Sequence, residues 1–230
     1  NPFNAKQVSR ISLRPRDVDV IVFWTRYAGP LLPYLDELDR RGIRYYFLYT
    51  LMRNPRELDP KSPSHEKSID TFCRLADRVG KEKMVWRYDP IVFTSLTDAD
   101  FHGETYQRIA EKLKGYTRKC IISVVDIYRK ATGRLRLLEK KGIKILEPPE
   151  QEFNRLISHI ADTGLANDME VRTCAEEQGL CSQAILPGKC IDDELIRKVF
   201  GLDFAARKDP SQRPACGCVA SRDIGMYDTC

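Results

Sequence analysis

The alternation of short apolar runs with amphipathic helical patterns limits the fold of this chain more than any other property of the sequence. Residues 18–24, 45–51, 84–88 and 120–125 are rich in Val, Ile, Tyr and Trp, as buried strands are. Helical patterns separate these runs at intervals of roughly thirty residues, with loops long enough for crossovers. The sequence therefore predicts βαβ units and a parallel sheet, either a barrel or an open, doubly wound sheet.

Capping residues and helix breakers indicate where the intervening helices begin and end. Ser62 and Gly80 are expected to cap a helix over residues 63–79. Gly164 is expected to stop the helix that the prolines at 148–149 open. Further helices are predicted from residue 30 and over 100–113 and 132–141, and short strands over 143–146 and 169–173.

The composition of the chain changes at Cys174. Beyond it, thiols, glycines and loops dominate, interrupted by one short amphipathic helix over residues 192–200. We therefore predict an α/β domain over residues 1–173 and a cysteine-rich region over 174–230 that folds against it.

The charge and hydropathy of the chain point to a soluble protein. The net charge of +5 is modest, and the basic residues are spread among acidic ones, so nucleic acid is not indicated as a partner. A small-molecule, phosphate-bearing or nucleotide-like ligand stays possible. No run is long and apolar enough to predict a membrane span, and no signal peptide is visible, so a cytoplasmic location is expected. The first residue, an asparagine, and the final cysteine suggest a fragment of a longer protein.

Cysteines near the end of the chain form the clearest chemical motif. Cys216 and Cys218 flank a glycine in polar sequence, and Cys230 follows twelve residues later. Such spacing suits a soft metal or an iron–sulfur cluster, because thiolates on one loop can reach one centre. Three thiolates leave three possibilities: another cysteine completes the site, the last ligand lies beyond the sequence, or one position stays open.

The other cysteines divide into candidate ligands and core residues. Cys174 follows a predicted strand, and Cys190 precedes a helix, where backbone N–H groups favour a thiolate. Both are predicted ligands, whereas Cys181 has less support. Cys73 and Cys120 lie in apolar patterns and are expected to be buried core residues.

Polar residues at the carboxyl ends of strands are the candidate binding residues, since these ends form the functional edge of a parallel sheet. Trp24 and Arg26 follow the first strand, and Arg87 and Asp89 lie two residues apart at the end of the third. In an extended strand, side chains two residues apart project to the same side. The Arg and the Asp can therefore either hold the charged groups of a ligand or pair with each other as a structural ion pair. Trp24 fits a pocket wall or a core position equally well.

Several common catalytic motifs are absent from the sequence. It contains no P-loop, no Gly-x-Ser-x-Gly, no Gly-x-Gly-x-x-Gly and no His-x-x-x-His. His65, His102 and His159 are expected to be solvated on their helices rather than to bind metal.

Four stretches together resemble the DUF1848 family of bacterial and archaeal proteins. They are Phe-Trp-Thr-Arg at 23–26, Trp-Arg-Tyr-Asp-Pro at 86–90, Cys-Ile-Asp at 190–192, and residues 212–230 with their three cysteines. The C-terminal cysteines of that family are similar to the cluster-binding cysteines of radical SAM enzymes. The resemblance implies a barrel-like (TIM-barrel-like, partial barrel) α/β body, an N-terminal strand and helix before this chain, and further cysteines after it.

The resemblance implies an iron–sulfur protein, with a [4Fe–4S] cluster held by Cys174, Cys190, Cys216, Cys218 and Cys230 as candidate ligands. Trp24, Arg26, Arg87 and Asp89 would then bind substrate or cofactor, and S-adenosylmethionine is a possible cofactor. A radical-SAM-like or redox enzyme is the leading hypothesis. The alternatives are a non-catalytic module in which zinc or a cluster stabilises the C-terminal region, and a phosphate-binding hydrolase that uses Arg87 and Asp89.

Overall fold

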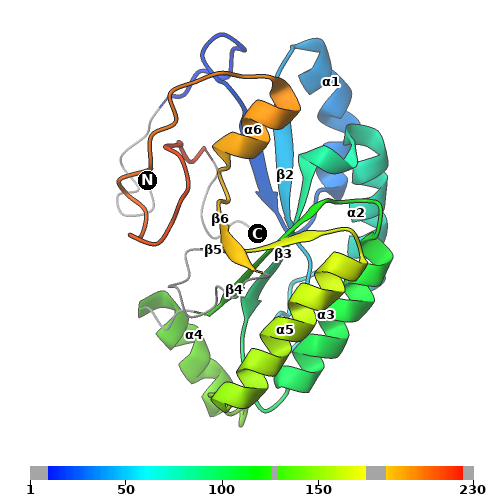
Figure 1. The fold of residues 1–230 in the computed structure, drawn as a ribbon, viewed down its shortest axis with the longest axis vertical. Helices are drawn as coiled ribbons and strands as arrows, with labels where there is room; N and C mark the ends of the chain where they lie inside the picture. The colour runs from blue at the N-terminus through cyan, green and yellow to red at the C-terminus, as the bar shows by residue number, and fades with distance from the viewer. Residues whose placement is uncertain (1–9, 126–128, 175–184, 225–230) are drawn as a thin grey trace.

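A parallel six-stranded sheet forms the centre of the protein (Figure 1). The structure is a computed structural model that describes residues 10–125, 129–174 and 185–224. The strands lie in the sheet in the order in which they occur in the chain, and every neighbouring pair is parallel. They are β1 (Ile21–Thr25), β2 (Tyr45–Thr50), β3 (Met84–Ile91), β4 (Lys119–Val124), β5 (Glu170–Cys174) and β6 (Leu186–Gly188).

The predicted parallel α/β architecture is confirmed, but the sheet is open. β1 pairs only with β2 and β6 only with β5, so both are edge strands and no barrel is closed. The strand predicted over residues 143–146 is wrong: Ile145 makes one isolated bridge to Thr94. β6 was not predicted, and it belongs to the sheet although it lies within the cysteine-rich region 174–230.

The helices agree with the predicted pattern. A 3₁₀ helix over Gly29–Tyr34 leads into the first α-helix, and a second short 3₁₀ turn covers Lys81–Lys83. The α-helices are α1 (Leu35–Arg40), α2 (His65–Val79), α3 (Ala99–Leu113), α4 (Arg129–Lys140), α5 (Glu150–Ala166) and α6 (Asp193–Phe200).

Two of the predicted helix ends differ from the structure. Ser64, not Ser62, caps α2, because the Ser64 hydroxyl accepts the backbone N–H of Lys67. Gly164 lies inside α5 rather than at its end. A Cβ at Gly164 would lie 2.2 Å from Cγ2 of Val171, so this glycine is needed for α5 to approach β5 closely.

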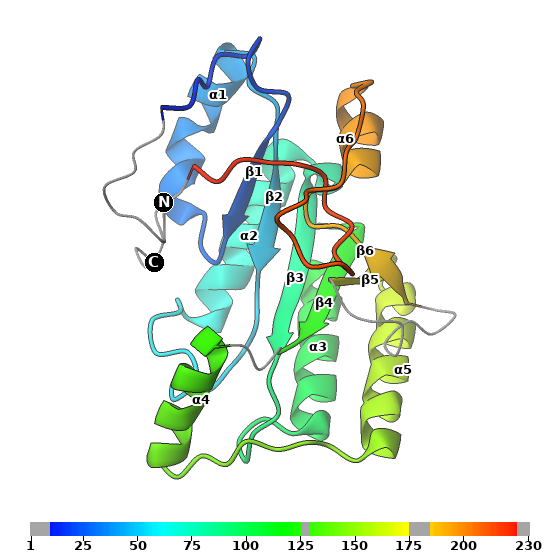
Figure 2. The same ribbon diagram turned by 90° about the vertical axis from the view of Figure 1, so that its left-hand side faces the viewer.

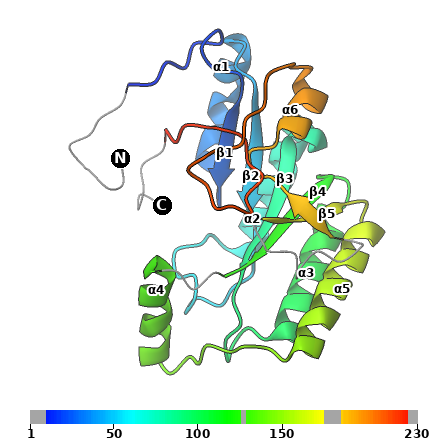
Figure 3. The same ribbon diagram turned by 60° about the vertical axis from the view of Figure 1, so that its left-hand side comes forward.

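Helices cover one face of the sheet. Leu35 of α1, Phe72 of α2, Tyr106 of α3 and Ile160 of α5 are fully buried in one apolar core, against side chains such as Trp86. Figure 2 shows these helices behind the strands, and Figure 3 shows α4 apart from them, beyond the carboxyl ends of the strands. No helix of the described residues is long and apolar enough to cross a membrane.

The helices between the strands leave the opposite face of the sheet uncovered, and we call it the helix-free face. The cysteine-rich region, with α6, covers it. Alternate strand residues, Tyr46, Leu48, Val85 and Ile121, form a second core with Cys190, Cys216, Cys218 and Ile196 of α6. The segment 201–224 crosses this face in front of the strands (Figure 2). Every residue of β2 is buried, because side chains on both faces of the sheet are covered.

One buried carboxylate attaches α6 to the first residue of β4. Asp192 caps α6 by accepting the backbone N–H groups of Glu194 and Leu195 at 2.9 and 3.2 Å. Its other oxygen accepts from Nζ of Lys119, at the start of β4, at 2.7 Å. Asp192 therefore joins a helix cap to an ion pair that is largely removed from water.

Replacing Asp192 by Ala is expected to lower the free energy of unfolding by about 3 kcal/mol or more, because the cap is lost and Lys119 loses its closest carboxylate. Asp98→Ala is the matched control, since Asp98 caps α3 through the N–H of Phe101 alone and is exposed. It should cost about 1 kcal/mol. Urea unfolding followed by circular dichroism measures both, and equal losses would contradict the structural role of the Lys119 pair.

Candidate metal and ligand site

Four cysteines from three segments of the chain meet on the helix-free face of the sheet. Cys174 ends β5, Cys190 follows β6, and Cys216 and Cys218 lie in the C-terminal segment. The Sγ atoms of Cys174 and Cys190 are 3.3 Å apart. Cys216 and Cys218 pack in the same buried core as Cys190, and the side chain of Cys218 interacts with those of Cys190 and Cys216. We call these four residues the thiol cluster.

Buried backbone and aromatic groups hold the thiol cluster in place. Sγ of Cys218 accepts the N–H groups of Cys190 and Ile191 at 3.2 and 3.4 Å. The hydroxyl of Tyr46, a fully buried residue of β2, donates to the carbonyl of Cys190 at 2.8 Å and accepts the N–H of Asp192. The loop that carries Cys190 is therefore fixed both to the sheet and to Cys218.

The glycine between Cys216 and Cys218 lies close to the side chain of Lys189. A Cβ at Gly217 would lie 3.1 Å from Cγ of Lys189, so a larger residue would push against the loop that carries Cys190. After it, the N–H of Val219 donates to the carbonyl of Ile191 at 3.1 Å. The Cys-Gly-Cys turn is thereby placed directly beside the loop of Cys190.

The four thiols differ in acidity. The hydrogen bond from Cys190, aided by the N–H groups of Cys190 and Ile191, lowers the pKa of Cys218 to about 5. A hydrogen bond from Cys190 also lowers the pKa of Cys174. The same two bonds raise the pKa of Cys190 itself, and burial raises that of Cys216 to about 11. The pKa is therefore lowered at two of the thiols and raised at the other two.

The thiol cluster brings four thiols together in pairs. No group of three or more His, Cys, Asp or Glu side chains that could hold a metal ion is present among the described residues. Four thiols are nevertheless the donor set of tetrahedral zinc and of iron–sulfur clusters. The predicted ligand Cys230 and the less supported Cys181 lie outside the described residues.

The two cysteines predicted as core residues lie on the helix-covered face. Cys120 is fully buried, which confirms its prediction. Cys73 is half-buried and packs against the edge of the same core. Neither belongs to the thiol cluster.

Three of the four predicted binding residues lie together at the carboxyl edge of the sheet. Nη2 of Arg87 is 2.6 Å from Oδ2 of Asp89, and the guanidinium lies over the indole of Trp24 at 4.1 Å from its centroid. The hydroxyl of Ser123, on β4, donates to Oδ1 of Asp89. Arg87 is only 4% exposed and Trp24 is 55% exposed. We call these four residues the strand-end group.

The fourth predicted binding residue has a different partner. Arg26 forms an ion pair with Asp59, on the loop that follows β2, and its side chain is 44% exposed. Sequence reasoning missed Ser123, which is an ordinary residue of a buried strand and becomes notable only through its contact with Asp89.

The strand-end group lies next to the thiol cluster. Ile122 pairs with Thr173, so the following residues, Ser123 and Cys174, are neighbours across β4 and β5. The hydrogen bond from Cys190 has the largest effect on the pKa of Cys174; beyond it, the charge of Arg87 lowers this pKa and that of Asp89 raises it. Both charges of the ion pair therefore act on a cysteine of the cluster.

The prediction that His102 is solvated is wrong. His102 is fully buried, with Nδ1 2.9 Å from the hydroxyl of Tyr88 and Nε2 3.1 Å from the carbonyl of Val92. Burial lowers its pKa. It is a hydrogen-bonded core residue between α3 and the loop that follows β3. His65 and His159 are half-buried.

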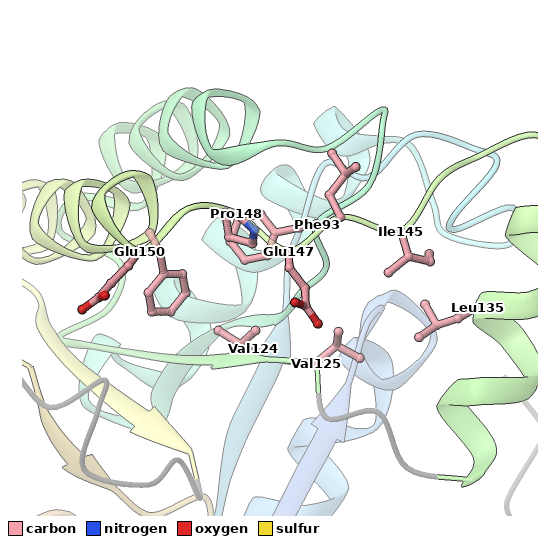
Figure 4. Close-up of a pocket in the computed structure, with 10 residues that line it drawn as sticks. Phe93, Val124, Val125, Leu135, Ile145, Glu147, Pro148 and Glu150 are labelled. Atoms are coloured by element: carbon pink, nitrogen blue, oxygen red, sulfur yellow. The ribbon is translucent and has the colours of Figure 1, made fainter.

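A mostly apolar cavity of about 530 Å³ lies beyond the end of β4 (Figure 4). The carboxylate of Glu147 points toward Val124 and Val125, whereas the carboxylate of Glu150 points away from these two residues (Figure 4). The cavity is lined by Phe93, Val124, Val125, Leu135, Ile145, Leu146, Glu147, Pro148, Glu150 and Phe153. This cavity was not predicted, because its lining comes from four separate parts of the chain.

Comparison with protein families gives a match that covers the whole chain. The family model DUF1848, described as a domain of unknown function, matches residues 1–230. The resemblance seen in the motifs is thereby confirmed over the whole chain. The search of curated proteins found no match.

The acidity of Cys218 can be measured in reduced, metal-free protein through the ultraviolet absorbance of thiolates. At pH 7 Cys218 should be ionised, because its pKa is about 5. Cys218→Ser should then remove thiolate absorbance that titrates with a midpoint near 5.

The matched control for this titration is Cys120→Ser. Burial raises the pKa of Cys120 to about 12, so removing it should leave the absorbance at pH 7 unchanged. A Cys218 signal that titrates near 8.5, the ordinary value of a cysteine, would show that the hydrogen bonds to its sulfur do not stabilise the thiolate.

Proposed function

The chain belongs to the DUF1848 family, and we propose that it is an iron–sulfur protein whose cluster is bound by Cys174, Cys190, Cys216 and Cys218. The observation that carries the proposal is the convergence of four thiols, separated by up to 44 positions (218 − 174), at one place on the sheet. Cys230 is proposed as a further ligand, of this or of a second cluster.

The environment of the thiol cluster fits this role. Two backbone N–H groups donate to Cys218, and such hydrogen bonds stabilise a metal-bound thiolate and tune its electronics. Cys190, Cys216 and Cys218 are buried, which would limit the access of solvent to a bound cluster. An iron–sulfur cluster supplies one-electron chemistry, and the fixed thiols of this chain would hold it.

We propose a redox or radical-SAM-like reaction at the carboxyl edge of the sheet. The strands follow one another in sequence order with α1, α2, α3 and α5 on one face, as in part of a TIM-like barrel, which supports the barrel-like interpretation of the open sheet. The helix-free face then corresponds to a barrel interior. Trp24 and Arg26 are the proposed substrate-contacting residues, since both are exposed at this edge. S-adenosylmethionine remains a possible cofactor.

A cytoplasmic location is part of the proposal. Thiols that serve as metal ligands must stay reduced, and the cytoplasm maintains that state. A small molecule is the proposed partner of the exposed edge.

Zinc bound by the same cysteines is the second candidate, in a non-catalytic role. Two thiolates about 2.3 Å from one zinc ion lie about 3.8 Å apart, which is close to the 3.3 Å between Cys174 and Cys190. Three of the four thiols also lie within the core that attaches the cysteine-rich region to the sheet. A metal here would stabilise that attachment.

The hydrolase alternative receives less support. A phosphate would need the guanidinium of Arg87, which already pairs with Asp89, stacks on Trp24 and is almost completely buried. Binding a phosphate there would require this pair to separate.

Anaerobic purification of the full chain, followed by iron and sulfide analysis and by visible and EPR spectra, tests the proposal. Cys190→Ser and Cys218→Ser should each lower the iron content at least about tenfold, since even groups that only support a ligand have effects of that size. Cys120→Ser should retain the iron, because Cys120 lies on the other face of the sheet. Colourless protein with stoichiometric zinc would refute the iron–sulfur proposal and leave the zinc candidate.

A further inference from the structure

We infer that Arg87 and Asp89 act as an opposed pair of charges that sets the reduction potential of the cluster bound by the thiols. Arg87 would raise the potential and Asp89 would lower it, and neither would be a ligand. The inference rests on the proposed function, because it requires an iron–sulfur cluster at Cys174, Cys190, Cys216 and Cys218.

The two charges are held rigidly. The guanidinium of Arg87 is fixed on one side by the indole of Trp24 and on another by Asp89, and it is 4% exposed. Asp89 is fixed in turn by the hydroxyl of Ser123. Buried or partly buried charges are screened much less by salt than exposed ones, so removing either charge should be felt by nearby groups.

The donors of Arg87 are only partly used within the protein. Its Nε–H is buried and has no hydrogen-bond partner in the part of the chain that the structure describes. A buried guanidinium donor without an acceptor is costly. A negatively charged group beside it, such as thiolates with their bound cluster, would offset that cost electrostatically.

The pair lies within reach of the thiol cluster. Neighbouring strands are about 4.8 Å apart, so β3, which carries Arg87 and Asp89, is about 10 Å from β5, which ends in Cys174. Asp89 reaches toward this strand through Ser123, the neighbour of Cys174. The side chain of Arg87 shares the helix-free face with Cys174, because Ile121, its partner in β4, packs in the same core.

The two charges act in opposite directions on the pKa of Cys174. The pKa of Cys174 is lowered first by its hydrogen bond from Cys190 and then by Arg87, and it is raised by Asp89. The pKa of Cys190 is raised by its hydrogen bonds with Cys174 and Cys218 and by burial, against the charge of Arg87.

The sign of each effect follows from the charge of the reduced state. Reduction adds one negative charge to a cluster, so a nearby positive charge favours the reduced state and a negative charge disfavours it. A purely structural ion pair makes a different prediction: removing either partner would lower stability, without opposite effects on the potential.

The test is a redox titration, followed by visible or EPR spectra, of anaerobically purified full-length variants. Arg87→Gln should shift the potential to a more negative value, and Asp89→Asn should shift it to a more positive value. The double variant Arg87→Gln/Asp89→Asn, which removes both charges and leaves hydrogen-bonding groups of similar shape, should lie between the two. Arg87→Lys should stay closer to the wild type than Arg87→Gln.

Arg155→Gln is the matched control. Arg155 pairs with Asp100 between α5 and α3, on the other side of the sheet. Its substitution should leave the reduction potential unchanged. If Arg87→Gln does not fold, Asp89→Asn and the double variant still decide the sign. Intact clusters with unchanged potentials, or shifts in the same direction for both single variants, would overturn the inference. A wild-type protein without iron would instead refute the proposed function.

Discussion

The structure depends on the burial of the helix-free face of the sheet. Tyr46, Leu48, Val85 and Ile121 make that face apolar, yet the helices between the strands pack on the other side. The cysteine-rich region supplies the missing layer, with α6 and the Cys-Gly-Cys turn as its buried parts. Since the hydrophobic effect drives this contact, the fold brings the thiols together whether or not a metal is bound, and a metal would add to an attachment that already exists.

The strands and helices were largely predictable, because apolar periodicity and capping residues report local structure directly. β6 was not, since three residues that include Pro187 and Gly188 have no strand-like composition; pairing with β5 alone makes them a strand. The apolar sequence of β2 indicates that both faces are covered, but not which segment covers each. Whether the sheet closes into a barrel depends on whether its two edge strands pair with each other. No local sequence pattern shows this.

The candidate site was predictable where chemistry follows from spacing along the chain. Cys216 and Cys218 share a turn, and Arg87 and Asp89 share a strand face, so both pairs could be identified before the fold was known. Contacts between distant segments were not visible: Arg26 pairs with Asp59 and Ser123 joins Asp89 only because of the way the loops and strands are placed. His102 was predicted to be solvated because histidine is polar. It is buried because each of its ring nitrogens has a hydrogen-bond partner, and these partners come from other parts of the chain.

Charge links the covering of the sheet to the chemistry of the thiols. Four thiolates on an apolar face would repel one another, and the metal-free protein avoids this by keeping Cys190 and Cys216 protonated, as their raised pKa values indicate. A metal ion or cluster must displace those protons, so binding releases them and becomes more favourable as the pH rises. Cys218 and Cys174, whose pKa values are lowered, would be the first thiols to bind a metal. The interactions among the metal-free thiols would thus leave two that ionise first and two that lose their protons only as a metal binds.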